Sequence, residues 1–153
     1  MVNILYGVSG EGSGHSSRSK EIITYLQKKH NVHVITYGKA YPYLKQYFPT
    51  TEIYGLRLKF KDNKVQYLGT LQHNIKNLFA SSQKFKALHR LVKKYKPGIV
   101  ITDFEPTCYY LAKLYNIPLV SLDNQHRITN LALDIPPRYK KDFLLCKAVI
   151  HMM

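Results

Sequence analysis

Short apolar runs alternate with amphipathic segments along the 153-residue chain. The runs are apolar almost throughout, which is typical of strands buried on both faces of a parallel sheet. The predicted strands are residues 2–8, 32–37, 99–102, 117–122 and 148–152. The predicted helices are residues 15–29, 39–48 (a short helix or turn), 69–95, 105–115 and 134–145. Two short extended runs between residues 53 and 68, around KDNK, indicate a hairpin.

This alternation predicts an α/β fold, namely a Rossmann-like, doubly wound, mostly parallel sheet. The length predicts a single domain over residues 1–153. Because the chain stops directly after the predicted strand 148–152, we expect the rest of a larger protein, or a partner subunit, to cover that end. Cys108 and Cys146 are expected to be buried free thiols. The amino terminus lacks the pattern of a secretory signal, so a cytoplasmic location is expected.

Candidate chemistry begins in the loop after the first strand, where residues 7–19 read GVSGEGSGHSSRS. Glycines alternate at Gly10, Gly12 and Gly14, and His15 follows at once. A dinucleotide site needs G-x-G-x-x-G and a later acidic residue, and the second strand is followed here by Gly-Lys instead. A nucleotide P-loop needs Lys after the last glycine and is excluded. In a third interpretation, a substrate packs against the loop and His15 points into a cleft. Alternatively, His15 merely caps a helix.

Two more loops follow predicted strands, TDFEPT at residues 102–107 and LDNQHR at residues 122–127. Such loops converge on one crevice in an open α/β sheet. They bring acids, amides and a second histidine toward His15, an arrangement suited to general-base catalysis. Alternatively, Asp103 caps the helix that follows it, and Asp123 does the same in its own loop. The spacing matches no metal signature, so no metal is expected.

The stretches ILYGVSGEGSGHSSRSKEI and VITDFEPTCYYLAKLYNIPLVSLDNQH resemble the amino-terminal half of GT-B glycosyltransferases. The nearest resemblance is to the family 28-like group, which includes the enzyme adding N-acetylglucosamine to lipid I, diacylglycerol galactosyltransferases and teichoic-acid-type transferases. The resemblance implies that the sugar acceptor binds this half. It also implies that a second, carboxyl-terminal domain or a separate donor subunit binds the nucleotide sugar, usually a UDP-sugar, with no further cofactor.

The resemblance further implies the site residues. His15 is the expected base for the acceptor hydroxyl, aided by Asp103 or Glu105, and the acceptor displaces UDP directly with inversion. The expected substrate-binding residues are Gly10, Gly12, Ser13, Gly14, Ser16, Arg18, Asp123, Asn124, Gln125 and His126.

The net charge of the chain predicts a further binding partner. Lys and Arg number 23 against 9 Asp and Glu, a net charge of +14, which indicates an anionic partner. Many of the basic residues lie between residues 39 and 96 among Tyr and Phe, as at an anionic membrane surface. We therefore expect peripheral binding at the inner face of the membrane and a lipid-linked or membrane-proximal glycan acceptor. A solvated cationic face is the alternative, and no nucleic-acid-binding signature is found. An NAD(P)-type oxidoreductase domain or a non-catalytic binding subunit stays open as a different class.

Overall fold

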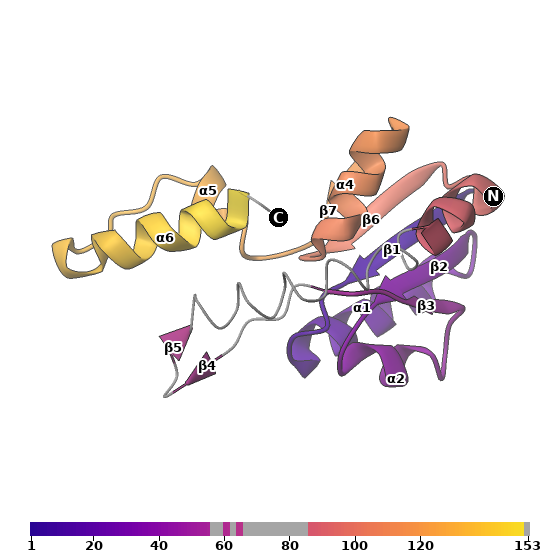
Figure 1. Ribbon diagram of the computed structural model, residues 1–153, viewed down its shortest axis with the longest axis horizontal. Helices are drawn as coiled ribbons and strands as arrows, with labels where there is room; N and C mark the ends of the chain where they lie inside the picture. Colours follow the sequence, from indigo (N-terminus) through magenta and orange to yellow (C-terminus); the bar gives the residue numbers. More distant parts are fainter. Residues whose placement is uncertain (56–59, 62–63, 66–85, 152–153) are drawn as a thin grey trace.

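The computed structural model describes residues 1–55, 60–61, 64–65 and 86–151 (Figure 1). At its centre lies a five-stranded sheet in the order β3-β2-β1-β6-β7, and every pairing in it is parallel. The strands are β1 (Asn3–Val8), β2 (Asn31–Thr36), β3 (Thr50–Glu52), β6 (Ile99–Asp103) and β7 (Leu119–Ser121). The predicted α/β fold with a mostly parallel sheet is therefore confirmed.

Helices cover both faces of this sheet. Ile4, Tyr6 and Val8 of β1 pack into one apolar cluster with Ile23 and Leu44, which lie on α1 (Ser13–Leu26) and α2 (Ala40–Leu44). Leu5 points to the other face. There it packs in a second cluster with the helical residues 86–95 and with α4 (Pro106–Tyr115). Because alternate residues of β1 enter different clusters, the central strand is buried on both sides, as its continuous apolar sequence predicts.

Two predictions for the middle of the chain have different outcomes. The hairpin is confirmed, because β4 (Phe60–Lys61) pairs antiparallel with β5 (Lys64–Val65). The predicted helix 69–95 falls within the described residues only from residue 86 onward, and that portion is helical. The edge strand β3 was not predicted, because its sequence, Thr-Thr-Glu, carries no apolar pattern.

The predicted last strand, residues 148–152, is wrong. The chain continues after β7 into α5 (Arg127–Asn130), a short 3-10 helix η1 (Pro137–Tyr139) and α6 (Lys140–His151), and α6 includes the residues expected to be extended. A short apolar run such as AVIHM does not distinguish strand from helix, and here the helix that begins at Lys140 simply continues through it. In Figure 1, α5 and α6 lie to the left, away from the sheet.

The two cysteines differ in exposure. Cys108 on α4 is buried as expected, whereas Cys146 on α6 is exposed, and both are free thiols. Within the ranges that the structure describes, no helix combines the length and apolar character needed to cross a bilayer.

Candidate active site

The glycine loop joins β1 to α1, and its first two glycines are required by the backbone. Gly12 precedes α1 with φ 82°, in the left-handed region that side chains disfavour. A Cβ on Gly10 would lie 2.2 Å from the carbonyl oxygen of Tyr37, so the loop passes too close to the chain after β2 for any side chain. Gly14 is different. It lies in the first turn of α1, and a Cβ there would meet no atom within 4 Å.

The turn after β6 carries the carboxylates of Asp103 and Glu105, and several hydrogen bonds stabilise its conformation. The Thr102 hydroxyl donates to the carbonyl oxygen of Glu105 and accepts from its N–H, both at 2.9 Å. The N–H of Ser9 donates to the carbonyl oxygen of Asp103 at 3.0 Å, which ties this turn to the glycine loop. Between the two carboxylates, Phe104 has φ 55°. A bulky residue in that conformation costs about 1–3 kcal/mol and persists where its surroundings enforce it.

The Asp103 carboxylate is fully buried at the end of β6. It accepts hydrogen bonds from three side chains of α1: His15 Nδ1 at 2.7 Å, Ser19 Oγ at 3.0 Å, and Arg18 through Nε at 3.1 Å and also through Nη2. Burial by itself would raise the pKa of Asp103, but the hydrogen bonds from His15, Arg18 and Ser19 outweigh burial and hold this pKa below its usual value. Asp103 is therefore an ionised acceptor at neutral pH.

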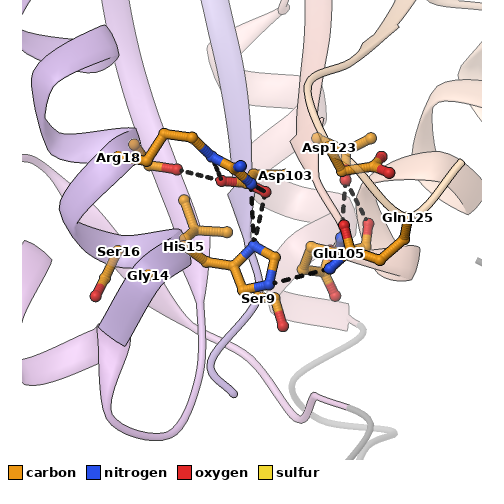
Figure 2. A network of polar contacts seen from close by, with 12 residues as sticks. Ser9, Gly14, His15, Ser16, Arg18, Asp103, Glu105, Asp123 and Gln125 are labelled. Carbon is orange, nitrogen blue, oxygen red and sulfur yellow. Dashed lines mark hydrogen bonds and ion pairs between the residues drawn. The ribbon is translucent and has the colours of Figure 1, made fainter. Parts of the chain in front are cut away.

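This contact determines how the His15 ring is protonated. Because a carboxylate only accepts hydrogen bonds, Nδ1 of His15 carries the hydrogen, and in the neutral ring Nε2 keeps its lone pair. Arg18 Nη2 lies 3.3 Å from the same Nδ1, a contact between two hydrogen-bearing nitrogens. On the other side of the ring, Nε2 faces the side-chain amide of Gln125 (Figure 2). The two nitrogens lie 3.5 Å apart. The pair can therefore take a proton at Nε2 while Asp103 stabilises the imidazolium that results.

The loop after β7 adds a second pair of the same kind. The Asp123 carboxylate accepts from the Ser121 hydroxyl, from the backbone N–H of His126 at 2.9 Å, and from Nδ1 of His126 at 2.8 Å. Burial would raise the pKa of Asp123, but these hydrogen bonds together lower it below its usual value. Thus Asp123 both caps its own loop, as the alternative interpretation held, and orients the ring of His126.

The Glu105 carboxylate has different hydrogen-bond partners from Asp103 and Asp123. Its carboxylate is fully buried and accepts from the backbone N–H groups of Thr107 at 3.1 Å and Cys108 at 2.8 Å, so it is the N-cap of α4. Burial raises its pKa to about 7. The helix-capping role considered for Asp103 therefore belongs to Glu105, and the catalytic role expected for Glu105 stays a prediction.

The remaining predicted residues divide by exposure. Ser13, Gly14 and Asn124 are exposed, whereas Ser16 is buried and its hydroxyl donates to the carbonyl oxygen of Ser13 at 3.0 Å. The helix-cap alternative for His15 does not hold, because the residue preceding α1 is Gly12. Arg18 contacts Asp103, and the substrate-binding role expected for it stays a prediction.

Sequence reasoning missed Ser19 and Phe104. Ser19 lies four residues after His15, on the same helix face, and that spacing was the available signal. Among the described residues, no group of three or more His, Cys, Asp or Glu side chains could hold a metal ion.

The fold is similar to that of several solved glycosyltransferases. The glycosyltransferase of kitacinnamycin superposes with a TM-score of 0.56 at 13% identity, covering 94% of this chain and 34% of that one. Arabidopsis thaliana UGT89C1 complexed with UDP has a TM-score of 0.56 at 17% identity, covering 95% and 42%. Glycosyltransferase VinC in complex with dTDP has a TM-score of 0.53 at 15% identity, covering 97% and 44%. The chain therefore spans less than half the length of these proteins, and the likeness shows a GT-B-type Rossmann-like fold.

Comparison with curated protein sequences gives no match. A family model described as glycosyl transferase family 1 matches residues 2–153, nearly the whole chain. Because that match extends over the sheet, the glycine loop and both carboxylate-bearing loops, the chain belongs to glycosyl transferase family 1.

Proposed function

We propose that this chain is the acceptor-binding part of a glycosyltransferase that uses a nucleotide sugar, with His15 as the general base. The observation that carries the proposal is the 2.7 Å hydrogen bond between His15 Nδ1 and the buried, ionised Asp103. It leaves the lone pair on Nε2, which faces the Gln125 amide at the edge of the sheet where the loops meet, to take a proton once an acceptor hydroxyl replaces that amide. Family membership favours glycosyl transfer over the oxidoreductase alternative.

In the proposed reaction, Nε2 of His15 takes the proton of an acceptor hydroxyl as its oxygen attacks the anomeric carbon of the donor sugar. The bond between that carbon and the diphosphate oxygen breaks, and the nucleoside diphosphate leaves with the electron pair. Attack opposite the leaving group inverts the anomeric centre. Asp103 stays ionised and stabilises the His15 imidazolium, and Arg18 and Ser19 hold the carboxylate in place.

The donor is proposed to be a UDP-sugar bound chiefly by a second domain or a donor subunit. Two of the similar structures are complexes with UDP and dTDP, which supports a nucleoside-diphosphate donor. The chain corresponds to 34–44% of the three similar proteins, which leaves room in such proteins for a donor-binding part.

The acceptor is proposed to be lipid-linked or close to an anionic membrane. The resemblance to the family 28-like group implies such an acceptor. Support comes from the net charge of +14 and from lysines paired with tyrosines on α1 and around α2. Lys20 Nζ lies 4.0 Å from the centroid of the Tyr47 ring, and Lys28 Nζ lies 5.4 Å from that of Tyr25. Both tyrosines are exposed, and exposed tyrosine beside lysine is typical of proteins that bind membrane interfaces.

The test is His15→Ala in the intact protein that carries this chain, assayed with its donor and acceptor. We expect kcat to fall by about 10²-fold or more, the scale of general-base catalysis, with acceptor affinity little changed. His30→Ala, a histidine in the turn that follows α1 at the end remote from the site, is the matched control and should leave kcat unchanged. A kcat near that of the wild type in His15→Ala would remove His15 from the chemistry and favour a non-catalytic binding role.

A further inference from the structure

Phe104 lies between the two histidines of the candidate site. Its ring stacks on that of His15, with centroids 6.3 Å apart and planes 12° apart. It meets the ring of His126 edge to face, with centroids 6.4 Å apart and planes at 74°. The three rings come from α1, from the turn after β6 and from the loop after β7, so Phe104 is the apolar contact between the two polar pairs.

The packing of the fold does not account for this residue. Phe104 is half-buried, and in the part of the chain that the structure describes, neither apolar cluster on the faces of the sheet includes it. Its left-handed backbone is one that bulky side chains disfavour. The turn enforces that conformation through the Thr102–Glu105 hydrogen bonds and the Ser9–Asp103 bond. A strained, partly exposed aromatic residue beside a candidate base indicates a ligand contact.

The groups around the ring indicate what that ligand is. The amide of Gln125 reaches toward Nε2 of His15, while its Oε1 is buried and has no hydrogen-bond partner among the described residues. His126 and Asp123 add polar atoms on the other side of Phe104. One aromatic face framed by amide, imidazole and carboxylate groups suits a sugar ring, which presents C–H bonds on its face and hydroxyls around its edge. A flat apolar alcohol would need apolar cover and would leave these polar groups unpaired.

We propose that Phe104 is the platform on which a pyranose ring of the acceptor lies, with one sugar hydroxyl directed at Nε2 of His15. The Oε1 of Gln125 accepts a hydrogen bond from a neighbouring hydroxyl as the amide moves off the histidine. This proposal rests on the proposed function and adds a substrate class, an acceptor that ends in a sugar.

The test measures binding instead of turnover, on the intact protein with UDP added to occupy the donor site. Saturation-transfer NMR is recorded with methyl β-D-glucopyranoside and methyl β-D-galactopyranoside. We expect the ring C–H protons of at least one glycoside to receive saturation from the wild type and from Phe104→Tyr. In Phe104→Leu the affinity should fall about tenfold or more. Tyr139→Leu, which removes an exposed aromatic ring on η1, is the matched control and should bind as the wild type does.

The outcomes separate this proposal from the proposed function. Unchanged glycoside affinity in Phe104→Leu would overturn the platform, even where His15→Ala abolishes turnover. Binding of p-nitrophenol without binding of either glycoside would overturn it as well. Loss of glycoside binding in Phe104→Leu would support it even where His15→Ala retains turnover. If Phe104→Leu does not fold, Phe104→Gly, which fits the left-handed backbone, takes its place with the same expected loss.

Discussion

At the residue scale, two buried carboxylates separated by a single residue have opposite chemistry. Asp103 contacts a guanidinium, an imidazole and a hydroxyl, and its pKa is held low. Glu105 accepts from the backbone N–H groups of Thr107 and Cys108 in a fully buried place, and burial raises its pKa to about 7. The partners that the fold supplies, and not the residue type, make one carboxylate a charged anchor for His15 and the other a titrating helix cap.

The raised pKa of Glu105 predicts a pH dependence of stability. Between about pH 4.5, the ordinary pKa of a glutamate, and about pH 7, the folded protein holds a proton that the unfolded chain has released. The contribution of this group to the free energy of unfolding is therefore fully present below pH 4.5 and is lost as the pH rises to about 7. Glu105→Gln removes the titration, so the Tm of the wild type should fall relative to that of the variant as the pH rises across this window in thermal melts.

Glu21→Gln, an exposed glutamate on α1, serves as the control and should leave the pH profile of the melting temperature as it is in the wild type. Parallel wild-type and Glu105→Gln profiles from pH 4.5 to 7 would show that Glu105 does not titrate in that range.

At the element scale, α1 is the helix that assembles the site. Its first turn follows the glycine loop, and one of its faces presents His15, Arg18 and Ser19 to the end of β6. Gly14 lies in that same turn with open space where a Cβ would be. Glycine lowers helix stability relative to alanine, so the protein's own packing gives no reason for it there. Close approach of a ligand does give such a reason.

Gly14→Ala should therefore separate stability from function. We expect the free energy of unfolding to stay level or rise by up to about 1 kcal/mol, because alanine favours the helix. We expect KM for donor or acceptor to rise, because the methyl group occupies space that the substrate needs. Denaturant unfolding and steady-state kinetics of the intact protein measure the two quantities.

Gly12→Ala is the matched comparison, since its φ of 82° makes any side chain strained. That variant should lose about 1–2 kcal/mol of stability. A Gly14→Ala enzyme with wild-type kcat and KM would place the substrate away from this turn.

At the scale of the whole molecule, the parallel sheet brings together loops that are distant in sequence. Val8 of β1 is paired with Asp103 of β6, and Thr102 of β6 with Ser121 of β7, so the loops after these three strands leave one edge side by side. The cationic charge is also a property of the whole surface. Lys20 on α1 and Lys28 in the turn after α1 pair with exposed tyrosines, on the face of the sheet opposite to α4.

This surface predicts salt-dependent membrane binding. In vesicle sedimentation at low salt, the intact protein should bind phosphatidylglycerol vesicles, bind neutral phosphatidylcholine vesicles weakly, and dissociate as salt screens the charges. Replacing Lys20 and Lys28 together by Gln should weaken binding on the order of 30-fold, since each basic residue near such a surface contributes about 1 kcal/mol.

The matched control replaces Lys113 of α4 and Lys140 of α6, which lie outside residues 39–96 and away from α1, by Gln and should change binding little. Equal binding to neutral vesicles, or binding to single-stranded RNA in place of vesicles, would contradict the membrane proposal.

The sequence by itself determined the sheet, most of its helices and the loops that carry the chemistry. Buried parallel strands are continuous apolar runs, and glycine-rich or acid-rich turns follow them directly. A short stretch of sequence is therefore enough to identify each strand and the turn after it. The sequence failed at residues 148–152, where a short apolar run is ambiguous, and at β3, whose polar residues pair only because β2 offers a free edge.

Only the tertiary structure decided which side chains meet. Asp103 and Glu105 are equivalent in the sequence as partners for His15, and the choice between them depends on contacts across 88 residues of chain separation. Ser19 is indicated in the sequence only by its spacing from His15, and Phe104 by no motif. Each matters because α1, β6 and the loop after β7 converge at one edge of the sheet. Hydrogen-bond partners and burial, which set the charge of a carboxylate and the tautomer of an imidazole, exist only once distant segments pack together.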